Sequence, residues 1–238
     1  MTIDIVMPAR NEAPTVAHNV AAARACVYAR EIIVVDDGST DDTGDLAREA
    51  GAKVIRREAS TGSKAHAMAD GVAASDAEAI LFVDADCTGL SAAHLDAICK
   101  PFVDGRAVMS VGLFDYGPLN PVFRRWPPIS GERVIPRWVF EAIPPRKLDG
   151  YTIEIRINEV IAEARLPTTV CTMRGVFHRT KRKKLGVSKG FQATWEMWRD
   201  LFSMLRGDVR WRTYWYYLQN LTVARPAPAA PLSRPPAR

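Results

Sequence analysis

Three observations predict that this 238-residue chain forms an α/β domain with a mostly parallel, doubly wound sheet flanked by helices. Short apolar runs rich in β-branched residues alternate with helical stretches through the first half of the chain. Polar and acidic residues follow each run, at the position where open α/β sheets bind their ligands. Hydrophobic residues make up 47% of the chain and charged residues 25%, which is ordinary for a globular protein.

The first half of the chain shows this alternation in order. Ile3–Met7 is an apolar run of strand length that stops at Pro8, and a polar turn then leads into a helix expected from about Pro14. Glu31–Val35 is β-branched after its first residue, as expected of a buried strand. Two further strands, at Ala52–Arg56 and from Ala79 to Asp84, and two further helices, at residues 60–74 and 91–103, complete this half.

The second half of the chain is less regular. Ala107–Leu113 is expected to be a fifth strand, and the Gly, Pro and Trp of residues 114–128 predict a long loop that shapes a binding site. A short helix through Ile143, a helix at Tyr151–Ala164 and a strand at Thr168–Phe177 are expected to follow. Residues 191–224 are predicted to form an aromatic helical extension, and the Pro/Ala-rich residues 225–238 a disordered tail.

Basic residues are unevenly distributed along the chain, whose net charge is +5. No acidic residue occurs between Ala164 and Trp195, and a basic run at residues 179–189 follows the last expected strand. Such a run suits a polyanionic partner, which could be a phosphate group, an anionic membrane surface or nucleic acid.

Cysteine spacing and the N-terminus predict the cellular compartment. The four cysteines form no C-x-x-C pair, so neither a disulfide framework nor a structural zinc is indicated. The first residues lack a basic segment followed by an apolar stretch, and no apolar run approaches the ~20 residues of a membrane span. These features predict a cytoplasmic protein with neither a signal peptide nor a membrane span.

A metal site is predicted where the fourth strand ends. The apolar run from Ala79 leads directly into Asp84-Ala85-Asp86, which carries two carboxylates one residue apart. At an extended strand end both carboxylates point to the same side, and hard oxygen ligands suit Mg²⁺ or Mn²⁺ shared with a nucleotide diphosphate. Taken alone, such a pair of carboxylates could also cap a helix or lie on a solvated loop. Asp37, Asp41 and Asp42 could likewise cap a helix or form a turn.

Four segments together resemble those of a known enzyme family. They are, in order, Pro8-Ala9-Arg10-Asn11-Glu12, Val35-Asp36-Asp37-Gly38-Ser39-Thr40-Asp41, Gly62-Ser63-Lys64 and Asp84-Ala85-Asp86. Their order and spacing over residues 3–115 resemble the family 2 glycosyltransferases of the GT-A fold. In the second half, Gly131-Glu132-Arg133, residues 150–154 and His178 are similar to acceptor-side elements of the glucosyl-3-phosphoglycerate synthases and related transferases.

The resemblance implies a nucleotide-sugar site in the first half of the chain. Ala9 and Glu12 would lie along the base and ribose, and Asp36 would accept a hydrogen bond from the uracil N–H. Lys64, at a helix start, would reach the diphosphate, although a lysine at this position could also be solvated on the helix surface. The predicted nucleotide-sugar contacts are Pro8, Ala9, Asn11, Glu12, Asp36, Gly62, Lys64, Asp84 and Ala85.

The resemblance also implies a metal ion, Mg²⁺ or Mn²⁺, and an acceptor site. Asp86 would hold the metal directly and His178 would complete its coordination, while Asp84 would face the ribose or a metal-bound water. His18, His66 and His94 are predicted within helices as surface or packing residues. The predicted acceptor contacts are Gly131, Glu132, Arg133, Tyr151 and Lys184.

Glu154 and Asp84 form the predicted catalytic set. If the anomeric centre inverts, a carboxylate must activate the acceptor, and Glu154 at a helix start is the candidate base. If configuration is retained, no such base is required. Glu154 would then only position the acceptor or be an exposed helix residue.

The predicted function is metal-dependent transfer of a sugar from a nucleotide-sugar to a small phosphorylated or polyprenyl-phosphate acceptor. A UDP-sugar is favoured over a GDP-sugar. Residues 1–115 would form the donor half of the domain and residues 116–190 its acceptor half. The aromatic C-terminal helices would pack on the core, form a homodimer interface or lie on an anionic membrane.

Two other functions compete with this prediction; nucleic acid is not an expected partner of the enzyme, but it is one of the polyanions that the second alternative could bind. A sugar-phosphate nucleotidyltransferase usually has a Gly-rich basic loop after its first strand, where this chain has Pro8-Ala9-Arg10-Asn11-Glu12. A non-catalytic polyanion-binding or membrane-binding module would use the basic run, but it would leave the acids at the strand ends without a role.

Overall fold

The protein is described by a computed structural model. The described residues are 1–60, 62–123, 130–145, 148, 153–178, 215, 219 and 221–223. The predicted basic run, most of the aromatic extension and the predicted tail lie outside these ranges, as do Tyr151 and Lys184.

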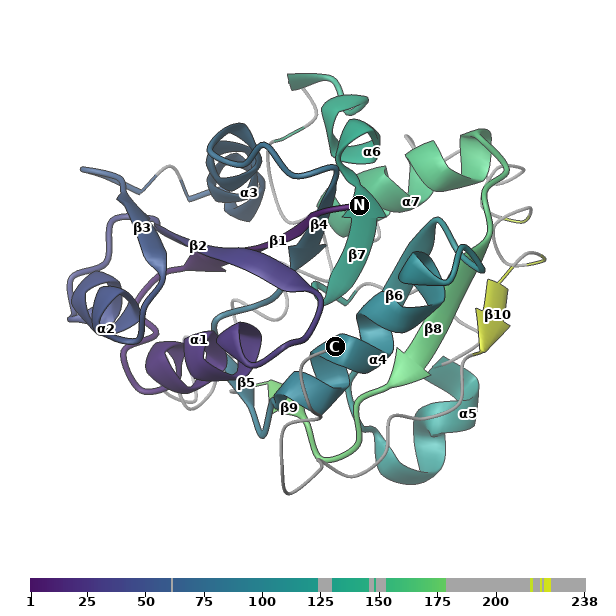
Figure 1. The fold of residues 1–238 in the computed structure, drawn as a ribbon, viewed down its shortest axis with the longest axis horizontal. Helices are drawn as coiled ribbons and strands as arrows, with labels where there is room; N and C mark the ends of the chain where they lie inside the picture. The colour runs from purple at the N-terminus through teal and green to yellow at the C-terminus, as the bar shows by residue number, and fades with distance from the viewer. Residues whose placement is uncertain are drawn as a thin grey trace.

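One eight-stranded sheet forms the centre of the fold (Figure 1). Its strands are β1 (Ile3–Ala9), β2 (Ala29–Asp36), β3 (Lys53–Arg56), β4 (Ala79–Phe82), β6 (Met109–Leu113), β7 (Arg133–Pro136), β8 (Thr168–Thr172) and β10 (Leu221–Val223). Their order across the sheet is β10-β8-β6-β7-β4-β1-β2-β3. Only β7 runs antiparallel to its neighbours, so the carboxyl ends of the other strands lie at one edge.

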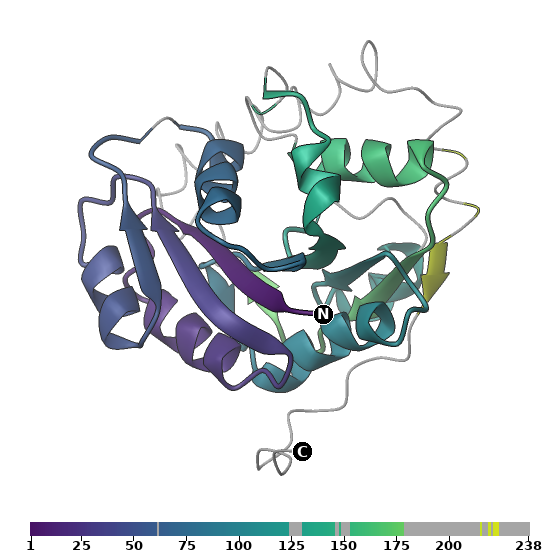
Figure 2. The same cartoon turned by 45° about the horizontal axis from the view of Figure 1, so that its top comes forward.

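Helices cover both faces of this sheet (Figure 2). One face carries α1 (Val16–Arg24), α2 (Thr43–Glu49) and α4 (Ala92–Val103), and the other carries α3 (Lys64–Ala73), α6 (Arg137–Glu141) and α7 (Ile153–Glu163). Each layer has its own apolar core because successive strand residues point to opposite faces. In β1, for example, Ile5 and Met7 pack with α1 and α4, whereas Val6 packs with α3.

A second, two-stranded antiparallel sheet joins distant parts of the chain. It pairs β5 (Cys87–Thr88) with β9 (Phe177–His178), and Cys87 lies opposite His178. Gly89 and Gly175 flank this pairing, and a Cβ on Gly89 would lie 2.4 Å from the Gly175 carbonyl oxygen. The two backbones therefore approach each other more closely than any side chain at residue 89 would allow.

The predicted mostly parallel sheet with flanking helices is confirmed, and strands from both predicted halves lie within it. His18, His66 and His94 lie in helices as predicted. Burial lowers the pKa of His94, which packs against the Ser91 hydroxyl and the Arg174 carbonyl.

Several predicted elements of the second half differ from the structure. From the sequence, the segment that forms β7 is expected to be part of a turn and a helix. Its apolar run, Val134–Ile135, is too short to show the hydrophobic periodicity of either a strand or a helix. The expected loop at residues 114–128 contains a 3₁₀ helix (Gly117–Leu119) and α5 (Asn120–Phe123). The expected strand Thr168–Phe177 is divided into β8 and β9 by a turn at Gly175, whose φ is +77°.

Within the predicted helical extension, Trp215 and Gln219 are helical, whereas Leu221–Val223 form β10, a strand that pairs with β8. In the described part of the chain, no helix has both the length and the apolar character needed to cross a membrane. All four cysteines are buried free thiols.

Candidate active site

The loops that follow β1 and β2 are joined by hydrogen bonds at the carboxyl edge of the sheet. The Asn11 side-chain oxygen accepts from Thr40 N at 2.9 Å, and Asn11 N donates to Ser39 Oγ at 3.0 Å. Asn11 has φ +55°, a left-handed conformation that asparagine tolerates better than most residues. Glu12 N donates to Thr43 Oγ1 at 2.8 Å, which ties the same loop to the start of α2.

Asp36, the predicted contact for the uracil base, is completely buried. Its Oδ1 accepts from Ser39 N at 2.9 Å, and its Oδ2 has no hydrogen-bond partner among the described residues. A Cβ on Gly44 would lie 2.7 Å from that Oδ2, so the carboxylate is pressed against the first turn of α2. This position stabilises the turn and the helix N-terminus. Arg56 Nε lies 3.7 Å from the same Oδ2, and the contact of Asp36 with a base stays a prediction.

A pocket of about 390 Å³ lies beside these loops, at the carboxyl ends of β2 and β3. Gly38, Ser39 and Thr40 line one side, and Arg56, Arg57 and Glu58 line the other. Asp37 lies next to it, where its carboxylate accepts from Arg57 at 3.1 Å and from Ser60 at 2.5 Å. Two arginines therefore line one side of this pocket, and one of them, Arg57, is paired with Asp37.

Lys64 joins two carboxylates from opposite sides of the site. Its Nζ lies 2.5 Å from Asp84 Oδ1 after β4 and 2.8 Å from Glu154 Oε1 in α7. Lys64 is the first residue of α3, which begins after the Ser63 N-cap, and Ser63 Oγ donates to Leu148 O. Three separate segments of the chain thus meet at one ammonium group.

The ion pairs shift the pKa values of Lys64 and Glu154. Burial alone would lower the pKa of Lys64, but the charges of Asp84 and Glu154 outweigh it and raise that pKa. Burial would likewise raise the pKa of Glu154, but Lys64 and Arg133 reverse the direction and lower it. Both side chains are therefore held in their charged forms, and Glu154 is a weak proton acceptor in this conformation.

Neither Glu154 nor Lys64 is a freely solvated helix residue. Glu154 is 6% exposed, so it does not lie on the outer surface of α7. Lys64 has a side chain that is 28% exposed, and two of its three ammonium donors face carboxylates.

Gly131 and Glu132 form a wall against the Asp84 segment. A Cβ on Gly131 would lie 2.5 Å and 2.6 Å from the two carboxylate oxygens of Asp84, so only glycine leaves room for this carboxylate. Glu132 is fully buried, and its Oε1 accepts from Cys87 Sγ at 3.2 Å and from Asp84 N at 3.4 Å. Burial and the charges of Glu132, Asp84 and Asp86 raise the pKa of Cys87, which therefore remains a neutral thiol that donates its proton.

Replacing Gly131 with alanine is expected to displace Asp84 and to lower kcat/KM by about 10²-fold, the effect of a misplacement of roughly 1 Å. Gly105→Ala is the matched control. Gly105 has φ +70° and open space around its Cβ position, so alanine there strains the backbone without touching the site. Steady-state kinetics on both variants, with thermal unfolding alongside, separate the two effects. Equal losses of activity would contradict the assigned position of Gly131.

Arg133 is also fully buried. Its guanidinium donates to the Ser130 carbonyl, to Glu154 O at 3.1 Å and to Asn158 Oδ1 at 3.0 Å. Glu132 and Arg133 are thus buried and engaged within the protein, and their contact with the acceptor stays a prediction. Both side chains point into the protein, where they support the segments that carry Asp84 and Glu154.

The residues of the Asp84-Ala85-Asp86 segment alternate in exposure. Ala85 is 2% exposed and Cys87 is fully buried, whereas Asp84 and Asp86 are partly exposed. The backbone of His178 pairs with that of Cys87, which is the residue after Asp86 in the chain. The two halves of the predicted metal site are thus adjacent in the fold.

The donor chemistry here fits a hard divalent cation. This region contains four carboxylates, those of Asp84, Asp86, Glu132 and Glu154. The positive charges of Lys64 and Arg133 partly neutralise them. Among the residues that the structure describes, however, no three or more His, Cys, Asp or Glu side chains are grouped to hold a metal. A cation at Asp86 would therefore need further ligands, such as the oxygens of a diphosphate.

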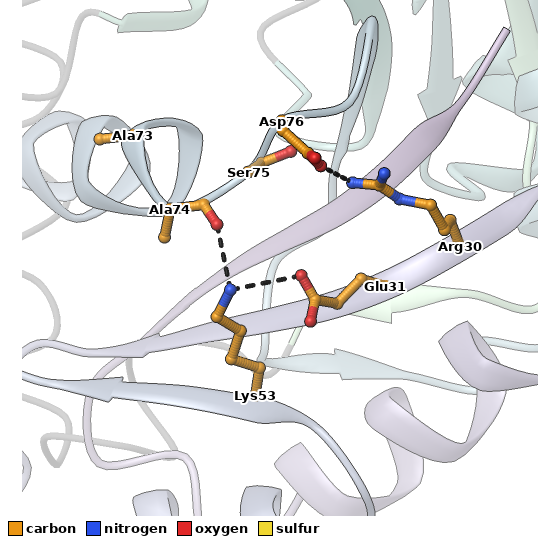
Figure 3. A pocket seen from close by; sticks show the side chains of 7 residues that line it. All are labelled: Arg30, Glu31, Lys53, Ala73, Ala74, Ser75 and Asp76. Carbon is orange, nitrogen blue, oxygen red and sulfur yellow. Dashed lines mark hydrogen bonds and ion pairs between the residues drawn. The ribbon is translucent and has the colours of Figure 1, made fainter.

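Another pocket, of about 640 Å³, lies at the opposite edge of the sheet (Figure 3). Arg30 and Lys53, at the amino ends of β2 and β3, line it together with residues 73–76 after α3. Figure 3 shows that Arg30 pairs with Asp76 and that Lys53 pairs with Glu31 and with the Ala74 carbonyl. Its cations are neutralised within the pocket, which is remote from the strand ends that carry the predicted site.

Two residues of the site were missed from the sequence. Thr15 and Asn19, at the start and in the first turns of α1, donate hydrogen bonds to the Asp84-Ala85-Asp86 segment. The available signal was a pair of polar residues four apart on a helix face that is otherwise apolar. Of the remaining predicted contacts, Pro8 and Ala9 are the last two residues of β1 and Gly62 lies in the loop before α3; Ala9 is buried.

Comparison with known proteins identifies the family of this chain. The family model described as "Glycosyl transferase family 2" matches residues 4–166. Glucosyl-3-phosphoglycerate synthase of Mycolicibacterium paratuberculosis is 33% identical over 127 residues, which cover 50% of this chain and 39% of that protein. 4,4'-Diaponeurosporenoate glycosyltransferase of Staphylococcus aureus is 37% identical over 92 residues, which cover 37% of this chain and 24% of that protein. The chain thus spans well under half the length of these curated relatives.

Solved structures show the same fold. The crystal structure of glucosyl-3-phosphoglycerate synthase from Mycobacterium tuberculosis with Mn²⁺, UDP-glucose and phosphoglyceric acid has a TM-score of 0.62 and 25% identity. The match covers 75% of this chain and 72% of that chain. A structure of the same enzyme with Mg²⁺ and UDP also has a TM-score of 0.62, at 24% identity. The predicted GT-A architecture is confirmed, and because the family model spans more than half of the sequence, this chain belongs to glycosyl transferase family 2.

Proposed function

We propose that this chain transfers a sugar from a nucleotide-sugar, with UDP-glucose as the first candidate donor, to an acceptor that carries a phosphate group. The observation that carries this proposal is the ion-paired group of Lys64, Asp84 and Glu154, at the carboxyl edge of the sheet of a family 2 chain. The glucosyl-3-phosphoglycerate synthase structures, with UDP-glucose and phosphoglyceric acid bound, supply the donor and acceptor candidates.

The donor would extend from the pocket at the ends of β2 and β3 toward Asp84. The base would enter the 390 Å³ pocket beside Gly38 and Arg57, and the ribose would lie along Asn11 and Glu12. Asp86 and His178 would hold Mg²⁺ or Mn²⁺, which supplies Lewis-acid stabilisation of the diphosphate leaving group. Lys64 would direct its third ammonium donor to the same diphosphate, where a fixed cation favours the developing negative charge.

The role of Glu154 follows from its ion pair. A general base works best with a pKa near the working pH, and the pairing with Lys64 holds the pKa of Glu154 below its ordinary value. Glu154 in this state is better suited to fixing Lys64 and to accepting a hydrogen bond from the acceptor. The ion pair with Lys64 therefore supports a mechanism in which Glu154 is not the base that activates the acceptor.

The acceptor would bind on the side of Gly131 and α7. Glu132 and Arg133 are buried, so acceptor contacts would come from Gly131 and from the predicted Tyr151 and Lys184. A phosphorylated small molecule and a polyprenyl-phosphate share the phosphate that the basic run at residues 179–189 would recognise.

The test is transfer from radiolabelled UDP-glucose to 3-phosphoglycerate, compared with polyprenyl-phosphate in detergent, each with Mn²⁺ or with EDTA. Metal-dependent labelling of 3-phosphoglycerate is the expected result. Labelling of the lipid instead would keep the sugar transfer and change the acceptor. If calorimetry detects no binding of any UDP-sugar or GDP-sugar, the proposal is overturned.

Metal and nucleotide are expected to bind cooperatively. Because the described carboxylates supply too few grouped ligands for a resident ion, Mn²⁺ should bind weakly alone and more tightly once UDP is present. Linkage requires that UDP raise the Mn²⁺ affinity by the same factor by which Mn²⁺ raises the UDP affinity. Two calorimetric titrations, each with and without the other ligand, measure both factors. Mn²⁺ binding that is equally tight without UDP would contradict this expectation.

A further inference from the structure

The Asp84-Ala85-Asp86 segment is held from beneath by side chains of α1. Asn19 Nδ2 donates to Ala85 O at 2.9 Å and to Cys87 O at 3.1 Å. Thr15 Oγ1 donates to the same Ala85 O at 2.8 Å, with a longer contact of 3.3 Å to Glu12 O. Two residues that lie 66 or more positions away in sequence thus fix both carbonyls that flank Asp86.

The chemistry of these contacts identifies Asn19 as the central residue. A carbonyl only accepts hydrogen bonds, so two carbonyls can be held by one side chain only if that side chain offers two donors. The amide nitrogen of Asn19 does so, and this settles the orientation of the amide. Asn19 is fully buried, and its Oδ1 has no hydrogen-bond partner within the described part of the chain.

The consequence for the segment is geometric. With the carbonyls of Ala85 and Cys87 directed toward α1, the side chains of these two residues are buried. Asp84 and Asp86, which alternate with them, are partly exposed. The segment lies beyond the last residue of β4, Phe82, so the main ladder of the sheet does not fix it. The hydrogen bonds from Thr15 and Asn19 supply that constraint, together with the Asp84 N contact to Glu132 Oε1 and the pairing of Cys87 with His178.

We propose that Asn19, together with Thr15, is the positioning residue that presents Asp86 to the metal and the diphosphate. This inference rests on the proposed function, because it assigns the pair a role in metal-dependent nucleotide binding. A purely structural role would lower the stability of the fold without a specific effect on the metal. A positioning role predicts that the substitutions weaken UDP binding in Mn²⁺ but not in EDTA. A purely structural role predicts that UDP binding changes equally in both.

The experiment is calorimetric titration of UDP in Mn²⁺ and in EDTA for the full chain and for four variants. Asn19→Leu keeps the side-chain size and removes both donors. Thr15→Val keeps the shape and removes the hydroxyl, whereas Thr15→Ser keeps the hydroxyl. Val20→Ala is the control, because Val20 is a fully buried core residue on the same helix and its side chain has no polar atom.

In wild type, the ratio of the UDP dissociation constant in EDTA to that in Mn²⁺ measures the contribution of the metal. Asn19→Leu and Thr15→Val are expected to lower this ratio by about tenfold, a typical effect of removing a hydrogen bond that orients a metal ligand. Their UDP affinity in EDTA should match that of wild type. Thr15→Ser and Val20→Ala should both keep the wild-type ratio.

Three outcomes would overturn the inference. Folded Asn19→Leu or Thr15→Val protein that keeps the wild-type ratio would show that these contacts do not position Asp86. An equal loss in Val20→Ala would show that the effect follows stability alone. Wild-type protein that is indifferent to both UDP and Mn²⁺ would overturn the proposed function and, with it, this inference. If Asn19→Leu does not fold, the pair Thr15→Val and Thr15→Ser still decides the question.

Discussion

Replacing Asp86 with alanine is expected to abolish the metal-dependent part of UDP binding and to lower kcat/KM for transfer by about 10²–10³-fold. The size follows from the several kcal/mol that a metal Lewis acid contributes to stabilising a charged leaving group. Stability should change little, because Asp86 is partly exposed at the end of a strand and is not part of either apolar core. Calorimetry with UDP and Mn²⁺, followed by transfer kinetics, measures both effects.

Asp76→Ala is the matched control for Asp86→Ala. Asp76 is also a carboxylate that follows a regular element, but it lies at the opposite edge of the sheet and its side chain is 86% exposed (Figure 3). Its removal should leave UDP binding and transfer unchanged. Full metal-dependent UDP binding by Asp86→Ala would refute the assignment of the metal to this residue.

Replacing Lys64 with methionine is expected to lower both transfer activity and stability. The change leaves Asp84 and Glu154 close together without the ammonium that lies between them. We expect a loss of about 2–3 kcal/mol in the free energy of unfolding, less than the roughly 3–5 kcal/mol for breaking a fully buried pair, because the Lys64 side chain is 28% exposed. Urea denaturation at neutral pH measures this loss.

The pH dependence gives this prediction a specific sign. The folded-state pKa of Glu154 is lowered, so its contribution to stability is present above the ordinary value of 4.5 and is lost as the pH falls through the folded pKa. The raised pKa of Lys64 contributes stability that is fully present below its ordinary value of 10.5. The difference in stability between wild type and Lys64→Met should therefore be constant near neutral pH and narrow as the pH falls below 4.5.

A second substitution tests the source of the lost stability. Adding Glu154→Gln to Lys64→Met removes one uncompensated carboxylate, so the double variant should be more stable than Lys64→Met alone. Its transfer activity should stay low, because both residues are assigned to the active site. If the two losses of stability simply add, Lys64 and Glu154 do not interact energetically in solution.

The sequence by itself determined the architecture and the edge of the sheet at which the site lies. Strand length, β-branched composition and the alternation with helices are local properties, so they predicted β1 to β4 and the helices between them. The acids and Asn11 lie where the strands end, and a parallel sheet brings such ends together. These patterns were sufficient to place Asn11, Asp36 and Asp84 at one edge of the sheet, whereas the role of Lys64 was implied by the family resemblance.

Only the tertiary structure decided which polar side chains face the site and which support it. Asp36 follows a predicted strand as Asp86 does, yet it is completely buried, as are Glu132 and Arg133, which the family resemblance assigned to the acceptor. Asn19 gave only a weak signal in the sequence, yet its side chain holds the carbonyls of the two residues on either side of Asp86. Lys64 and Glu154 are 90 residues apart and share a hydrogen bond of 2.8 Å. The reason is that burial and pairing depend on which elements pack together, whereas a motif records only neighbours along the chain.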